Sequence, residues 1–167
     1  MSSDLWSFSL ATYARPGVED ACLQLQTAGA NVCLLLCGLW LEQRGATCDE
    51  QRVRQLQALT GQWDIEVVRP LRTLRMQWKA RAVDDAVLKG MREQIKSLEL
   101  EAERALLSRL EGVAQEWMQN DAGSETWLEE LAGTAASPNR APRALRGGAR
   151  TGPFGARGGV FGGGGPP

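Results

Sequence analysis

The stretch Asn31–Leu41 constrains the fold more than any other part of the chain. Its last ten residues, Val32–Leu41, contain no polar side chain and form the longest such run in the sequence. Asn31 is a favourable helix N-cap, and Gly45 stands where a helix commonly ends. A helix that is apolar on every side must be buried in a bundle or in a membrane. Because a bilayer span needs about 20 residues, we expect a buried central helix.

The segments on both sides of this stretch also show helical periodicity. Expected helices begin near residues 4, 16, 48, 62, 85 and 125 and end near residues 14, 28, 60, 83, 119 and 132. Gly61 is expected to separate two of them. Pro70 either kinks the helix that contains it or begins a shorter one, and the periodicity crossing it in register favours a kink. Strand-like alternation is absent, so the sequence predicts an all-α helical bundle around the central helix.

The longest expected helix lies near the end of this bundle. Its apolar seam runs from Leu88 to Trp117, which is 30 residues, or about 45 Å of helix. A domain of this size has a diameter of about 35–40 Å, so we expect the helix to extend beyond its own bundle. Gly112 is a candidate break.

Composition divides the chain into a helical domain, residues 1–135, and a tail, residues 136–167. The tail holds 10 of the 19 glycines, five of the seven prolines and five arginines, without an acidic residue. Of the 19 basic residues, 14 therefore remain in the domain against 20 acidic ones, a net charge of −6. The tail cannot bury enough apolar surface to order itself, and we expect it to be disordered.

The absence of histidine excludes most hydrolytic mechanisms and histidine metal sites. The carboxylates of Glu99, Glu101 and Glu103 cannot all converge from one helix, and we expect a solvated acidic face. No glycine-rich phosphate loop follows a strand, so neither an enzyme, a cofactor nor a small-molecule substrate is indicated. The chain shows no signal-peptide pattern and is expected to be cytoplasmic and not membrane-bound.

Four cysteines leave two interpretations open. Three of them fall within apolar helical faces, as buried free cysteines commonly do. A thiolate metal site or redox sensor is the alternative, and the core interpretation is favoured. The four are Cys22, Cys33, Cys37 and Cys48.

The seam of the long helix is the predicted protein-binding surface. We expect a partner, or a second copy of the chain, to pack against it as helices do in coiled coils. Trp117 and Trp127 are expected to line a partner groove, since tryptophan is common at interface centres. The predicted contact residues are Leu98, Ala102, Ala105, Leu106, Val113 and Trp117.

Nucleic-acid binding is the alternative function. Basic residues recur at helical spacing before the long helix, and arginines recur in the tail. The basic stripe could instead pair with glutamates of the following helix, and an acidic domain is unusual for nucleic-acid binding. The residues concerned are Arg69, Arg72, Arg75, Lys79, Arg146, Arg150 and Arg157.

One distinctive block of sequence is Tyr13-Ala14-Arg15-Pro16-Gly17-Val18. It occurs together with Leu5-Trp6-Ser7-Phe8, Asn31-Val32, Leu34-Leu35-Leu36, Leu39-Trp40, Pro70-Leu71-Arg72 and Glu99-Leu100-Glu101-Ala102-Glu103. These blocks resemble a family of small proteobacterial proteins known only as a conserved domain of unknown function. The resemblance covers roughly residues 3–110 and implies a small helical cytoplasmic protein, with no activity, cofactor or site residue to carry over.

Overall fold

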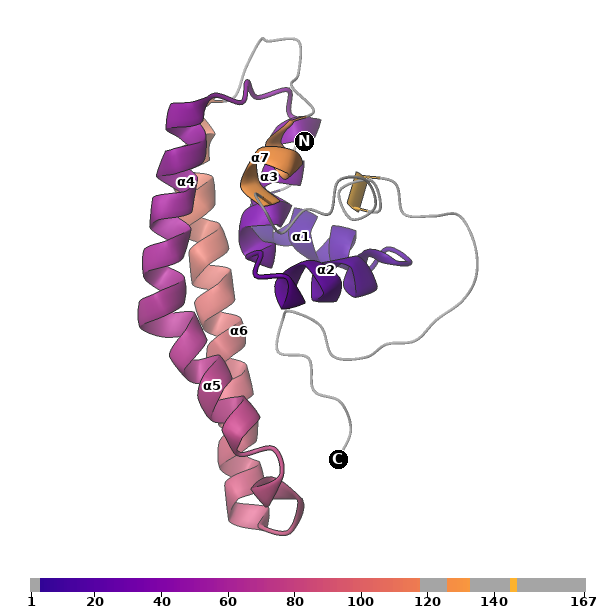
Figure 1. Cartoon of the computed structure of the whole chain (residues 1–167), viewed down its shortest axis with the longest axis vertical. Coiled ribbons are helices and arrows are strands. Elements are labelled where there is room, and N and C mark those ends of the chain that lie inside the picture. Colours follow the sequence, from indigo (N-terminus) through magenta and orange to yellow (C-terminus); the bar gives the residue numbers. More distant parts are fainter. Residues whose placement is uncertain (1–3, 118–125, 133–144, 147–167) are drawn as a thin grey trace.

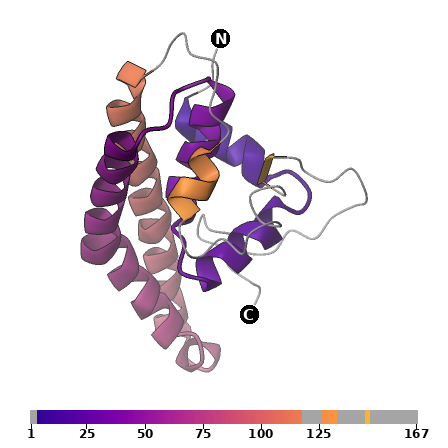
Figure 2. The same ribbon diagram turned by 45° about the horizontal axis from the view of Figure 1, so that its top comes forward.

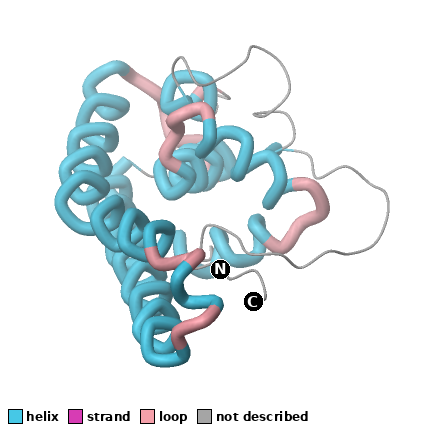
Figure 3. Tube along the Cα trace, turned by 60° about the horizontal axis from the view of Figure 1, so that its bottom comes forward, coloured by secondary structure: helices cyan, strands magenta, loops and turns pink. Residues whose placement is uncertain are grey.

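The computed structural model describes residues 4–117, 126–132 and 145–146 (Figure 1). Every regular element in these ranges is helical, which confirms the all-α prediction (Figure 3). The elements are α1 (Leu5–Tyr13), α2 (Val18–Thr27), α3 (Val32–Gln43), α4 (Glu50–Trp63), the π-helical turn Asp64–Val68, α5 (Arg69–Gln77), the 3-10 turn Arg81–Val83, α6 (Ala86–Ala114), the 3-10 turn Gln115–Trp117 and α7 (Trp127–Ala132). No helix in the described ranges is long and apolar enough to cross a membrane.

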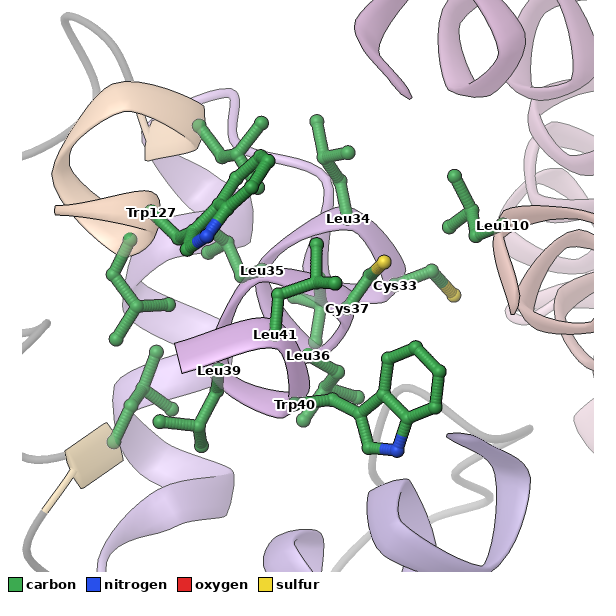
Figure 4. Packing of buried hydrophobic residues seen from close by; sticks show 14 of the residues in the cluster. Cys33, Leu34, Leu35, Leu36, Cys37, Leu39, Trp40, Leu41, Leu110 and Trp127 are labelled. Atoms are coloured by element: carbon green, nitrogen blue, oxygen red, sulfur yellow. The ribbon is translucent and has the colours of Figure 1, made fainter. Parts of the chain in front are cut away.

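Helix α3 is the predicted central helix. The Asn31 side chain accepts a hydrogen bond from the Leu34 amide at 3.2 Å, and Gly45 follows the helix with a φ of 69°. Every residue of the apolar run from Val32 to Leu41 is buried. Figure 4 shows its side chains radiating around the helix axis, with Trp127 and Leu110 reaching in from other elements. The helix therefore has no face toward solvent.

Five helices enclose α3, namely α1, α2, α4, α6 and α7. Helix α7 packs against α3 at Gly38. Trp127 of α7 is fully buried, and its indole Nε1 donates a hydrogen bond to the Ala46 carbonyl at 2.8 Å. A glycine in the middle of α3 thus provides the space that Leu131 and Trp127 of α7 occupy.

Helices α4, α5 and α6 form a long antiparallel hairpin. Figures 1 and 2 show its far end projecting beyond α1, α2, α3 and α7. Helix α6 has 29 residues, which is about 43 Å at 1.5 Å per residue. The expectation that the long helix extends beyond its bundle is confirmed. We call residues 64–98 the arm.

The chain stays helical through Pro70, and it changes direction between α4 and α5 (Figure 1). The π-helical turn Asp64–Val68 lies directly before the proline, which occupies the first turn of α5, where its missing N–H is tolerated. The predicted stop at Gly61 is wrong, because α4 continues to Trp63. Trp63 anchors this region by donating from Nε1 to the Ala102 carbonyl at 2.8 Å.

The boundaries of α6 differ from the prediction at one end. Asp85 caps its start by accepting from the Leu88 amide at 3.0 Å, as expected. The helix continues through Gly112 and gives way to a 3-10 turn after Ala114, short of the predicted 119. Residue 119 itself and most of the predicted tail lie outside the described residues. Within the tail range, Leu145 is described and belongs to the hydrophobic core.

We predict that Gly38→Val destabilises the protein by roughly 1–3 kcal/mol, the usual cost of overpacking. A Cβ atom at Gly38 would lie 2.8 Å from Cδ1 of Leu131 and 3.5 Å from Cβ of Trp127. The matched control is Gly61→Val in α4, where a Cβ atom meets nothing within 4 Å. Urea denaturation of both variants measures the difference. Equal free energies of unfolding would show that α7 does not pack on Gly38 as described.

Candidate functional site

The predicted contact residues of α6 do not form one free surface. Ala102 and Leu106 are buried in the core of the chain itself. Leu98 is 47% exposed, and Ala105 is half-buried. The seam therefore holds α6 to its own chain over much of its length. Among the predicted contact residues, Leu98 is the one most open to a partner.

The predicted tryptophan groove is filled from within the chain. The rings of Trp117 and Trp127 stack at 6.1 Å between centroids, with 10° between their planes. Arg52 lies over the Trp117 ring at 5.1 Å, and Val113 packs against the same core. Trp127, being fully buried, cannot reach a partner. The prediction for Trp127 is therefore wrong, because α7 folds back over α3.

Four charged residues join α5 to α6, and we call them the ion cluster: Arg72, Arg75, Glu99 and Glu103. Arg72 Nε lies 3.0 Å from Glu99 Oε1, and Arg75 Nε lies 2.6 Å from Glu99 Oε2. Arg72 Nη2 also donates to Glu103 Oε1 at 3.2 Å. Both glutamates are 1% exposed. The predicted solvated acidic face is thus wrong for Glu99 and Glu103, because α5 covers them with two guanidinium groups.

The carboxyl group of Glu103 has an unusual proton affinity. Burial and the neighbouring Glu99 carboxylate raise its pKa to about 8, although Arg72 and Arg75 act in the opposite direction. One of its oxygens, Oε2, has no hydrogen-bond partner among the described residues. Glu103 therefore holds its proton more readily than an ordinary glutamate.

Most of the described residues proposed for nucleic-acid binding are engaged within the chain. Arg72 and Arg75 belong to the ion cluster, and Arg69 pairs with Asp64 at 2.7 Å. Arg146 pairs with Glu42 at 2.8 Å and with Glu129 at 2.6 Å. The glutamate pairing of the basic stripe, left open by the sequence, is confirmed for Arg72 and Arg75. Of the other members, Lys79 is exposed, and Arg150 and Arg157 lie outside the described residues.

The cysteines occupy the body of the protein. Cys22, Cys33 and Cys37 are buried in the core, and Cys48 is half-buried. Burial raises the pKa of each thiol, which disfavours the reactive thiolate. In the ranges that the structure describes, no three acidic or cysteine side chains converge as a metal site requires. The core interpretation of the cysteines accounts for these positions.

The arm carries a row of exposed apolar side chains, of which the sequence predicted only Leu98 as a contact residue. Val87, Met91 and Leu98 are 76%, 47% and 47% exposed. Their spacing of four and seven residues places them on one side of α6. Met91 and Leu98 belong to the predicted seam, and Val87 is an apolar residue beside it that the seam did not include. We call these three residues the arm stripe.

The chain matches the model of a known sequence family. The model of the family described as "Protein of unknown function (DUF2390)" matches residues 4–110. This range agrees with the resemblance noted in the sequence. Neither the curated proteins nor the solved structures contain a match to the chain.

We predict that Arg72→Met costs roughly 2–3 kcal/mol in the free energy of unfolding. The substitution leaves buried carboxyl groups without their partner, which typically costs about 3–5 kcal/mol, and protonation of Glu103 relieves part of this. The control is Arg54→Met, which removes an exposed i,i+4 pair with Glu50 and should change stability by less than about 0.5 kcal/mol. Urea denaturation at neutral pH distinguishes the two. Similar losses in both variants would contradict a buried cluster.

We also predict that stability falls as pH rises from about 5 to 8. Glu103 ionises near its ordinary pKa in the unfolded chain but near 8 in the folded protein, so the folded state holds the extra proton in this window. The contribution is complete below the unfolded pKa and is lost as pH rises through the folded pKa. With no histidine in the chain, few other groups titrate there. Glu103→Gln should remove the decline in thermal or urea stability, and an unchanged decline would refute the assignment.

Proposed function

Because the chain belongs to this family, whose description assigns no activity, we propose its function from its own surface. We propose that it is a non-enzymatic protein-interaction module whose contact surface is the arm stripe. The occupant proposed is the same stripe on a second copy of the chain. The supporting observation is the concentration of exposed apolar side chains on one projecting element.

Exposed apolar surface is distributed unevenly over the described residues. Two of the nine large exposed apolar side chains, Leu10 and Leu23, lie on α1 and α2. The other seven lie on the arm: Ile65, Leu74, Met76, Val83, Val87, Met91 and Leu98. Single exposed apolar residues need no explanation, whereas a concentration on one element is typical of an interaction surface. The arm therefore carries most of the large exposed apolar side chains in the described part of the chain.

The arm stripe has the geometry of a helix-pairing surface. Its spacing of four and seven residues is that of one side of a coiled-coil heptad. A two-fold symmetric pair of antiparallel arms would bring Met91 and Leu98 together across the interface, which makes the surface self-complementary. Three side chains bury little area, and association entropy opposes the contact, so we expect a dissociation constant in the micromolar range.

The ion cluster supports this role by fixing the arm. Arg72 and Arg75 hold α5 against α6 beyond the hydrophobic core, so the arm stripe is presented by a paired rather than an isolated helix. A preorganised surface loses less conformational entropy on binding. The nucleic-acid alternative has less support, since these same arginines are neutralised within the chain.

We predict that wild-type protein self-associates at tens of micromolar and that Met91→Glu with Leu98→Glu abolishes this. Two carboxylates would have to be desolvated in the contact, while the exposed side of α6 should tolerate them in the monomer. Sedimentation velocity measures association, and circular dichroism checks helix content.

The matched control is Leu23→Glu on α2, which is also a partly exposed apolar residue, 39% exposed. It should leave association unchanged. A monomeric wild-type protein at these concentrations, or equal dissociation by the Leu23 variant, would refute pairing through the arm stripe.

A further inference from the structure

The last described segment of the chain, Leu145–Arg146, is fixed to the body by an apolar and an ionic contact. Leu145 is 1% exposed and belongs to the hydrophobic core. Arg146 pairs with Glu42 of α3 and Glu129 of α7, which lie outside the arm. This contact is therefore distinct from the arm stripe, and its test does not depend on the proposed self-association.

The Arg146 guanidinium is held by two carboxylates. Its Nε and Nη2 donate to Oε2 and Oε1 of Glu42, both at 2.8 Å. Its Nη1 and Nη2 donate to Oε1 and Oε2 of Glu129 at 2.7 and 2.6 Å. Paired hydrogen bonds between arginine and a carboxylate are stronger and more specific in geometry than single ones. They lower the pKa of Glu129 and raise the pKa of Arg146, which favours the ionised form of both.

Glu42 is a buried carboxylate whose hydrogen-bond donors come from beyond residue 110, where the family match ends. Its side chain is 6% exposed. Besides the two bonds from Arg146, Oε1 accepts a hydrogen bond from the Leu128 amide at 3.0 Å. That amide lies in the first turn of α7, where N–H groups lack an acceptor within the helix. A buried carboxylate needs a cationic partner, and this one receives it from residue 146.

The sequence around this contact resembles that of a short recognition motif. From residue 133 to residue 153, Leu145 is the only leucine, isoleucine, valine, methionine or aromatic residue. The twelve residues 133–144 separate it from the end of α7, and two glycines follow Arg146. One apolar anchor with an arginine beside it is therefore the whole of the large apolar and paired ionic contact that this stretch provides.

We propose that Glu42, Glu129 and the part of the core that receives Leu145 form a recognition site for a short peptide in which an aliphatic residue precedes arginine. The occupant is the Leu145–Arg146 segment of the chain itself, bound in cis. The aliphatic side chain contributes apolar burial. The two carboxylates select arginine over lysine, because the planar fork of N–H groups that they bind is absent from an ammonium group.

Tethering determines how strongly an external peptide has to compete for this site. A ligand joined to its own site by a short linker acts at a concentration on the order of 1 mM. Two anchoring side chains bind weakly without a tether, and we expect a dissociation constant of about 100 μM for the free peptide. The segment in cis should therefore weaken the binding of an external peptide about tenfold.

The test uses a fluorescein-labelled peptide with the sequence of residues 141–150 and two full-length proteins. These are the wild type and the double variant Leu145→Ala with Arg146→Ala, in which the site has lost its occupant. Fluorescence anisotropy should show about tenfold tighter binding to the double variant. Adding Glu42→Gln to the double variant should weaken binding at least tenfold, whereas adding Glu130→Gln, an exposed glutamate of α7, should leave it unchanged.

Two substituted peptides of equal net charge separate recognition from general attraction to the acidic domain. The peptide with Arg146→Glu loses the ionic anchor and should not bind the double variant. The peptide with Arg143→Glu keeps Leu145 and Arg146 and should bind. Equal binding of these two peptides would overturn the proposal, as would equal affinity of the unsubstituted peptide for wild type and double variant.

A measurement on the wild type alone decides the matter if the double variant does not fold. The protein carries nitrogen-15 and the peptide does not. Several millimolar of the unsubstituted peptide should displace the labelled segment and move the amide resonances of Leu145 and Arg146 toward their positions in the free peptide. The Arg146→Glu peptide should leave them in place. Resonances that do not respond to the unsubstituted peptide would contradict a displaceable occupant.

Discussion

The rest of the structure depends on the need to bury α3 on every side. An amphipathic helix can be satisfied by a partner on one face, but α3 has no polar face to leave in water. Enclosing it requires helices from both halves of the sequence, including α7 after the long excursion of the arm. Gly38 lets α7 approach closely, and Trp127 fills the remaining space with its indole N–H satisfied by Ala46. The segments around α3 have little surface left to offer a partner.

The arm is stabilised differently because it extends past the core. Its two helices are joined by the ion cluster, where Arg72 and Arg75 of α5 both pair with Glu99 and Arg72 also pairs with Glu103. Buried ion pairs add little net stability but penalise misalignment, since a slip of one turn would leave charges buried without partners. The arm can therefore be rigid while its outer side stays apolar and free. Arg72 and Glu103 also line a pocket between this hairpin and the N-terminus of α3.

The structural features that the sequence predicted correctly are those that depend on local chemistry or on a uniform pattern of residues. The burial of α3 followed from an uninterrupted apolar run, and the caps at Asn31 and Asp85 followed from side chains that bond to amides three residues later. The burial of Glu99 and Glu103 could not be read from their own helix, because the arginines that cover them lie 24 to 31 residues earlier. No periodic pattern in the sequence indicates the π-helical turn or the pocket. Trp127 was assigned to a partner groove because nothing local shows that α7 returns to α3.

The most direct test of the central claim, that the arm is the interaction surface, is hydrogen exchange of the full chain at low and at high micromolar concentration. The account predicts that amides of α6 between Val87 and Leu98 exchange more slowly at high concentration. Amides of α1 and α2 near Leu10 and Leu23 should exchange at the same rate at both concentrations. Added protection near Leu10 or Leu23, or exchange in the arm that does not depend on concentration, would contradict it.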